Sequence, residues 1–126
     1  MPSLASSREI SIDVETKDLE LTTLGPGVRR GAHIVGVARS ADAVRSVIAE
    51  LPTESHAVVG DVADPAVAEG ALEAAARLGR VWGLVNNAGI AAPGYHPLTE
   101  TTLSEWDEVL RVNLLSAASF ARVVGS

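Results

Sequence analysis

Two adjacent asparagines end a short apolar run, and their side chains are the first in the chain that suggest a chemical role. Residues 81–85 predict a buried strand, and Asn86, Asn87, Ala88 and Gly89 follow it directly. A buried amide without a partner costs about 1–3 kcal/mol, so both asparagines need hydrogen bonds. Open α/β sheets bind ligands at the carboxyl ends of their parallel strands. The group therefore indicates one wall of a ligand site, with an ordinary polar turn as the alternative.

Asn113 is a second polar residue in an unexpected place. Thr102 and Glu105 form a capping-box pair that predicts the start of a long last helix. Along it, six residues recur at three- and four-residue steps: Leu103, Trp106, Leu110, Asn113, Ala117 and Phe120. This stripe is expected to face the core, where Asn113 replaces an apolar side chain. Taken alone it is best explained as a core amide bonded to backbone, but its spacing from the Asn-Asn-Ala-Gly turn favours a functional role.

Alternating strands and helices are expected to position these residues. Residues 33–38 and 56–60 predict two further strands. Ser40 predicts the start of one helix, and Asp64 followed by Pro65 predicts the start of another, which Gly79 ends. Near-continuous apolar strands linked by helices indicate an α/β fold with a parallel sheet covered on both faces.

Residues 1–30 have a different pattern. Ile10, Ile12 and Val14 alternate with polar residues, which predicts a half-exposed strand. Residues 19–24 are a candidate for a second strand, in a hairpin that turns near Lys17. We therefore expect an atypical N-terminal segment over 1–30, either a hairpin or disordered, followed by one domain over 31–126.

The composition excludes several classes of partner. The 126-residue chain has a net charge of −6 and no basic stripe, which argues against nucleic acid and anionic membranes. It has no cysteine, and its three histidines lack ligand spacing, so no metal site is expected. The N-terminus has no signal-like apolar region, and no run approaches the ~18 residues of a membrane span. We expect a soluble cytoplasmic protein.

Several segments, read together, resemble a known family. VWGLVNNAGIAAP, followed by LTETTLSEWDEVLRVNLLSAASF, is similar to the middle of short-chain dehydrogenases/reductases. GAHIVGVARSADAV resembles the family's second strand and the helix after it, and the Asp61-Val62 pair resembles its Asp-Val motif. The likeness covers about residues 31–125. It implies a partial Rossmann-like sheet of about three core strands, with 31–126 as a partial NAD(P)-binding domain.

The resemblance implies roles for the matched residues. Asn113 would be the asparagine of the family's Asn-Ser-Tyr-Lys catalytic tetrad. Asp61 would meet the adenine amino group, and Val62 would flank the adenine ring. Four residues would hold the sheet around the adenosine ribose: Asn86, Asn87, Ala88 and Gly89. The substrate would be a small carbonyl or alcohol compound, and the 102–125 helix would pack against a second copy or a complementing chain.

The end of the second strand predicts which cofactor is preferred. NAD-dependent members usually carry an acidic residue there, which accepts a hydrogen bond from the ribose 2′-hydroxyl. Ala38 stands at that place and Arg39 follows it, which suits a 2′-phosphate. We therefore expect NADP in preference to NAD. Taken alone, Arg39 is equally well explained as a solvated loop cation.

Two parts of the family's machinery are missing from this sequence. Its glycine-rich phosphate turn should lie about twenty residues before Gly31, but no glycine is found near that place, and residues 25–27 leave no room for a helix. The single tyrosine, Tyr95, has Thr99 four residues on, and the single lysine is Lys17, so there is no Tyr-x-x-x-Lys pair. Such a proton donor contributes about 10²–10⁴-fold to rate. We expect weak NADP binding and no turnover.

Three functional hypotheses stay open. The first is an inactive piece of an NADP-dependent oxidoreductase, with a start altered near residue 28 by a frame change or a fusion. The second is a non-catalytic module that binds an adenine nucleotide or a protein. The third is one half of a split reductase, whose other chain carries the serine, tyrosine and lysine.

Overall fold

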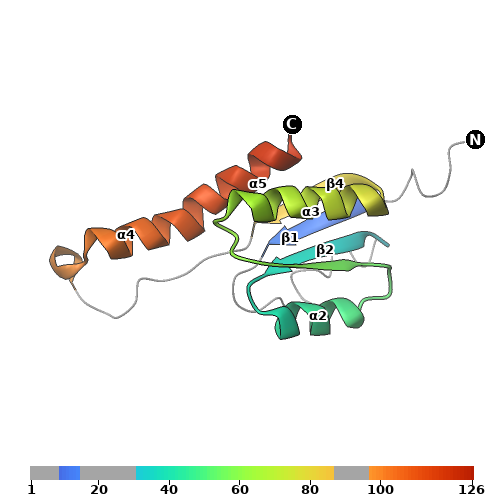
Figure 1. The fold of residues 1–126 in the computed structure, drawn as a ribbon, viewed down its shortest axis with the longest axis horizontal. Coiled ribbons are helices and arrows are strands. Elements are labelled where there is room, and N and C mark those ends of the chain that lie inside the picture. The colour runs from blue at the N-terminus through green and yellow to red at the C-terminus, as the bar shows by residue number, and fades with distance from the viewer. Residues whose placement is uncertain (1–8, 15–30, 87–96) are drawn as a thin grey trace, which may run out of the picture.

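The protein forms a parallel sheet with helices on both faces (Figure 1). The computed structural model describes residues 9–14, 31–86 and 97–126. Neighbouring strands are all parallel and lie in the order β3-β2-β1-β4. Their bounds are β1 (Glu9–Val14), β2 (His33–Ala38), β3 (His56–Val59) and β4 (Arg80–Asn86). The expected α/β fold is confirmed, with four strands in the described ranges where about three were expected.

The additional strand, β1, lies in the middle of the sheet, so the expectation of a half-exposed strand is wrong. Every side chain from Ile10 to Val14 is buried, including the polar ones of Ser11 and Asp13, and only Glu9 at the start of the strand is half-buried. The alternation misleads because the polar residues pair inside the protein. The hydroxyl of Ser11 donates a hydrogen bond of 2.7 Å to Asp13 Oδ1. The apolar and polar residues of β1 therefore alternate between two interior faces of the sheet, and neither face of this strand is exposed to solvent.

The expected hairpin partner, residues 19–24, lies outside the described residues. Within the described residues, β1 pairs with β2 on one side and with β4 on the other. The expected boundary between 30 and 31 also borders on that undescribed part and stays a prediction. Residues 9–14, however, share one sheet with the strands of the expected second domain.

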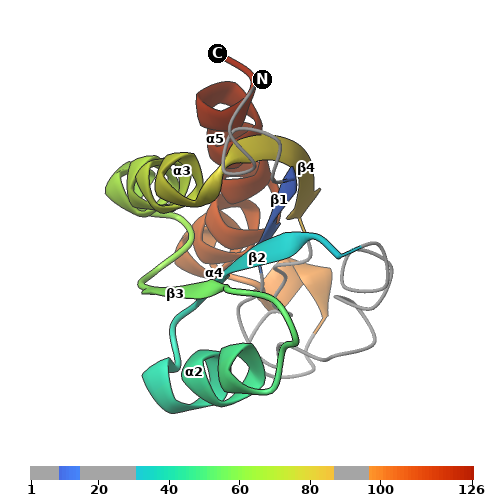
Figure 2. The same ribbon diagram turned by 90° about the vertical axis from the view of Figure 1, so that its right-hand side faces the viewer.

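Helices cover the two faces, as the alternation of elements predicts. On one face, α2 (Ala41–Ala49) packs Val44 against Ile34 and Ala38 of β2. On the other face lie α3 (Pro65–Leu78) and α5 (Ser116–Val124), with the larger part of the core. Figure 2 shows α2 separated from α3 and α5 by the strands.

The local signals that begin these helices are confirmed. Ser40 precedes α2 and accepts a hydrogen bond from the N–H of Ala43. Asp64 precedes α3 and accepts one from the N–H of Ala66, with Pro65 at the first helical position. Such caps satisfy backbone donors that have no partner within the helix.

The last helix is one continuous rod in three parts, preceded by the short turn η2 (Leu98–Glu100). It begins as α4 (Leu103–Leu110), with both hydrogen bonds of the Thr102 capping box present. A π-helical turn, η3 (Arg111–Leu115), then leads into α5. None of the helices in the described ranges is both long and apolar enough to cross a membrane.

The predicted inner stripe of this helix is wrong over its first half. Leu103 is 87% exposed, and Asn113 is also exposed, while the buried side chains are Val112, Ser116 and Phe120. Figure 1 shows the reason, because α4 extends beyond the sheet and only the later part of the rod lies over α3 and β4. The π-helical turn also adds a residue to the helical period, which shifts the face that meets the core.

Candidate functional site

The carboxyl ends of all four strands lie at one edge of the sheet, because the strands are parallel. Arg39 follows β2 and is exposed, Asp61 follows β3, and Asn86 is the last residue of β4. The structure thus gathers three of the predicted residues at one edge. Asn87, Ala88 and Gly89 lie outside the described residues, and so does Tyr95.

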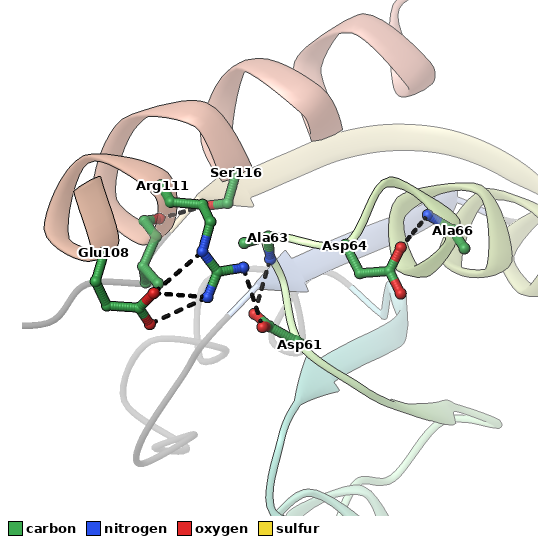
Figure 3. A network of polar contacts seen from close by, with 8 residues as sticks. Asp61, Ala63, Asp64, Ala66, Glu108, Arg111 and Ser116 are labelled. Carbon is green, nitrogen blue, oxygen red and sulfur yellow. Dashed lines mark hydrogen bonds and ion pairs between the residues drawn. The ribbon is translucent and has the colours of Figure 1, made fainter. Parts of the chain in front are cut away.

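Asp61 is held by both of its carboxylate oxygens (Figure 3). Oδ1 accepts a hydrogen bond of 3.0 Å from the N–H of Ala63, and Oδ2 lies 3.2 Å from Nη1 of Arg111. The Ala63 N–H lowers the pKa of the Asp61 carboxyl most, and Arg111 and the charge of Arg39 lower it further. The side chain is still 38% exposed. An ionised, partly open carboxylate at this edge can accept a hydrogen bond from a ligand.

Arg111 is the residue that sequence reasoning missed. Its Nε and Nη2 bind both carboxylate oxygens of Glu108 at 2.9–3.1 Å, while its Nη1 reaches Asp61. These contacts raise the pKa of Arg111 above its ordinary value, with Glu108 as the larger cause. The spacing of Glu108 and Arg111 is a signal for a helical ion pair. No sequence signal points to Asp61, which lies 50 residues away.

Val62 and Asn86 have structural contacts. Val62 is completely buried within the core beside α3. Its predicted contact with an adenine ring stays a prediction. The amide of Asn86 donates a long hydrogen bond of 3.5 Å to the carbonyl of Ala117 in α5. This contact joins β4 to α5, and the predicted role of Asn86 beside the adenosine ribose stays a prediction.

Asn113 lies exposed in η3, two residues after Arg111. Ser116 is buried, and its hydroxyl donates a hydrogen bond to the carbonyl of Val112 one turn earlier in the same helix. Arg111 belongs to the same π-helical turn as Asn113, and its ion pair with Asp61 connects that turn to the loop after β3. Single π-helical turns within α-helices are frequent at functional sites.

The described residues fit the adenosine end of a nicotinamide dinucleotide in their chemistry. Asp61 offers an ionised acceptor, and the nearby guanidinium of Arg39 offers a partner for a phosphate. The strand after which a pyrophosphate would lie is β1, and residues 15–30 that follow it are outside the described part. The sequence there has no glycine between Asp13 and Gly25.

A buried carboxyl at this end of β1 is the second feature that the sequence did not reveal. Asp13 is next to the last residue of the strand, and burial raises the pKa of its carboxyl, which the Ser11 hydrogen bond offsets in part. Asp13 pairs in register with Gly36 of β2 and Val85 of β4. It brings a second acidic group close to the candidate edge.

An open hollow of about 230 Å³ lies beside β3 and the end of α3, away from the candidate residues. It is lined by Glu54, Ser55, His56, Ala74, Arg77 and Leu78. His56 begins β3, so this hollow is at the amino end of that strand, opposite Asp61. No close group of metal-binding side chains occurs in 9–14, 31–86 or 97–126.

Comparison with known proteins connects this geometry to a family. The model of the short chain dehydrogenase family matches residues 26–125. D-threitol dehydrogenase of Mycolicibacterium smegmatis is 36% identical over 100 residues, which are 76% of this chain and 38% of that enzyme. The chain therefore spans well under half of the length of this relative.

Solved structures agree. The 3-ketoacyl-(acyl-carrier-protein) reductase of Brucella melitensis, complexed with NADH, superposes with a TM-score of 0.76 at 26% identity, covering 89% of this chain and 48% of that one. The L-sorbose reductase of Gluconobacter frateurii, complexed with NADPH and L-sorbose, gives 0.73 at 26% identity, covering 96% and 48%. With the family match over residues 26–125, they show that the chain belongs to the short-chain dehydrogenase family, whose members are NAD(P)-dependent oxidoreductases.

Proposed function

We propose that these 126 residues form the adenosine-binding part of a short-chain dehydrogenase and bind NADP weakly, in preference to NAD. The observation that carries the proposal is the partly open Asp61 carboxylate, with its lowered pKa, beside the charge of Arg39. Asp61 accepts from the adenine amino group, and Asn86 to Gly89 form the ribose side of the site. Val62 supports the adenine position from beneath, within the core.

The preference for NADP rests on charge at the end of β2. Ala38 is buried and offers no carboxylate for the two ribose hydroxyls of NAD, whereas Arg39 is exposed and offers a guanidinium. Guanidinium groups bind phosphate through paired N–H donors. The two solved relatives named above hold NADH and NADPH respectively, so the family fold accepts both and Arg39 decides between them.

We expect these 126 residues alone to catalyse no reaction. Asn113 is the matched member of the catalytic tetrad, but the sequence contains no tyrosine with a lysine four residues on. Hydride transfer to a carbonyl needs a proton donor at the oxygen. A small carbonyl or alcohol compound is the substrate class of the complete catalytic unit, in the cytoplasm, with its proton donor on other residues.

Two rival functions make different predictions. A non-catalytic module that binds a protein would show no response to NADPH. One half of a split reductase would gain activity when its complementing chain is added. The exposed leucines of α4 and η3 favour a helical contact with a second copy or such a chain, because Leu103, Leu114 and Leu115 are more than half exposed.

Fluorescence titration of NADPH tests the proposal. We expect a dissociation constant on the order of millimolar, with NADH weaker still. Arg39→Ala should remove the difference between the two cofactors while leaving binding of NADH unchanged. Arg45→Ala, at an exposed position of α2, is the control and should leave both constants unchanged. Equal affinity for NADPH and NADH in the unaltered protein would contradict the proposed role of Arg39.

A further inference from the structure

Arg111 joins three elements through one guanidinium group (Figure 3). It is the first residue of η3, it binds Glu108 of α4, and it reaches Asp61 in the loop between β3 and α3. Asp61 is not a neighbour of Arg111 in sequence, so the contact exists only because the fold brings the last helix over the carboxyl end of β3.

Glu108 determines where Arg111 points. Two parallel contacts, from Nε and Nη2 to the two oxygens of Glu108, fix the plane of the guanidinium. Nη1 then remains on the side that faces Asp61. A lysine has one nitrogen and no such fork, so it could not make both contacts with the same geometry.

The Asp61 carboxylate is in turn fixed by two donors from different elements. The Ala63 N–H binds one oxygen and Arg111 binds the other. A carboxylate oxygen has two acceptor positions, so each oxygen retains capacity for a ligand donor. Without Arg111, the carboxylate would keep one short-range contact within its own loop and would be free to rotate toward solvent.

We propose that Arg111 is a positioning residue: clamped by Glu108, it fixes the Asp61 carboxylate in the orientation that receives the adenine amino group, and it links that carboxylate to the turn that carries Asn113. The inference rests on the proposed binding of the adenosine end of NADP. It adds a residue to that site which does not itself contact the cofactor.

The charged groups around Asp61 set its pKa, so the positioning role of Arg111 can be tested by titrating Asp61. Arg111 in η3 and Arg39 after β2 are the cations that hold its pKa down, together with the Ala63 N–H. Asp64, the nearest acidic residue along the chain, turns its carboxylate to the N–H of Ala66 instead. Removing the charge of Arg111 should therefore raise the pKa of Asp61, while Arg39 and Ala63 stay in place.

The experiment compares Arg111→Met with Arg77→Gln in the full chain. Arg77 is an exposed arginine on α3 that pairs with Glu73 at 3.8 Å, so its loss is a matched control for a broken ion pair. The carboxyl carbon of Asp61 is titrated by NMR without ligand, and adenosine 2′,5′-bisphosphate is titrated at several pH values. Glu108→Gln is a third variant, which keeps Arg111 but weakens its clamp.

We expect Arg111→Met to move the Asp61 midpoint to higher pH and to reduce affinity for the bisphosphate on the order of tenfold, about the value of one lost orienting hydrogen bond. The acid limb of binding should move upward with the Asp61 midpoint. Glu108→Gln should reduce affinity for the bisphosphate less than Arg111→Met does, because Arg111 keeps its charge but loses its clamp, and Arg77→Gln should change neither the Asp61 midpoint nor the affinity.

The failures are distinguishable. An Asp61 midpoint that Arg111→Met leaves unchanged would overturn the positioning role, even if the variant were less stable to heat. Absence of bisphosphate binding by the unaltered protein would contradict the proposed function instead, since the Asp61 titration is measured without ligand. Equal loss of affinity in Arg77→Gln would also overturn the proposal, because it would reflect only a general loss of positive charge.

Discussion

The hydroxyl of Ser11 lies 2.7 Å from Oδ1 of Asp13, two residues along the central strand of the sheet, and both side chains are buried. Buried carboxyl groups are costly when ionised, and burial raises the pKa of Asp13. The protein therefore carries a destabilising acid in the middle of its sheet, next to the candidate site.

The pH dependence of stability follows from this acid. The pKa of Asp13 is higher in the folded protein than in the unfolded chain. The contribution of Asp13 to the free energy of unfolding is therefore most favourable at pH values below the unfolded pKa, and it is lost as pH rises through the folded pKa. Asp13→Asn keeps an acceptor for Ser11 and removes this loss. We expect the variant to be more stable at pH 7 by about 1 kcal/mol, which corresponds to roughly 4 °C in the midpoint of thermal unfolding.

Thermal unfolding followed by circular dichroism checks this at pH 4 and pH 7. The gain should be smaller at pH 4, where the native aspartic acid is closer to its neutral form. Ser11→Ala is the control with the opposite sign, because it removes the donor that offsets the cost of burial. A gain from Asp13→Asn that is the same at both pH values would show that charge is not its cause.

The start of α4 provides a second prediction. Thr102 and Glu105 exchange hydrogen bonds with each other's backbone N–H groups, at 3.2 and 2.7 Å. Because α4 has little tertiary packing, Thr102→Ala should destabilise its first turn by about 1 kcal/mol. Hydrogen exchange of the amides in residues 103–106 should speed up, while Ser104→Ala, at an exposed position of the same turn, should change it little. Equal effects of both variants would contradict the cap.

The exposed leucines of the last helix predict association. Leu103, Trp106, Leu110 and Leu114 are all exposed and follow each other at three- and four-residue steps. We expect the 13.0 kDa chain to elute above its monomer mass in size exclusion with light scattering. The double variant Leu110→Gln and Leu114→Gln should return it to the monomer.

Val59→Thr is the control for that experiment, because Val59 is also exposed but lies at the end of β3, remote from α4 along the chain. It should leave the measured mass unchanged. A monomer at all concentrations in the unaltered protein would contradict association through the helix.

The sequence predicts those parts of the fold that depend on neighbouring residues. Ser40, Asp64 and Thr102 each begin a helix, and the strand over 33–38 has the expected bounds. Caps and strand runs are local, so the residues that cause them are adjacent in the chain. The position of Asn86 at the end of a strand is also predicted locally, by the apolar run that precedes it.

What the sequence does not predict depends on contacts between distant residues. The alternation over residues 9–14 has the same appearance whether its polar side faces water or an internal pair such as Ser11 and Asp13. The buried face of the last helix depends on a π-helical turn at Arg111, which shifts Asn113 outward. The contact of Arg111 with Asp61 joins residues 50 apart and follows only from the folded sheet.

One measurement tests the central claim most directly: NMR chemical-shift mapping of the chain with adenosine 2′,5′-bisphosphate, compared with adenosine 5′-monophosphate. The account predicts that both ligands shift the signals of Asp61 and Asn86, that the bisphosphate also shifts Arg39, and that the bisphosphate binds more tightly. Shifts confined to the hollow beside His56 and Arg77, or no shifts at millimolar ligand, would contradict the account.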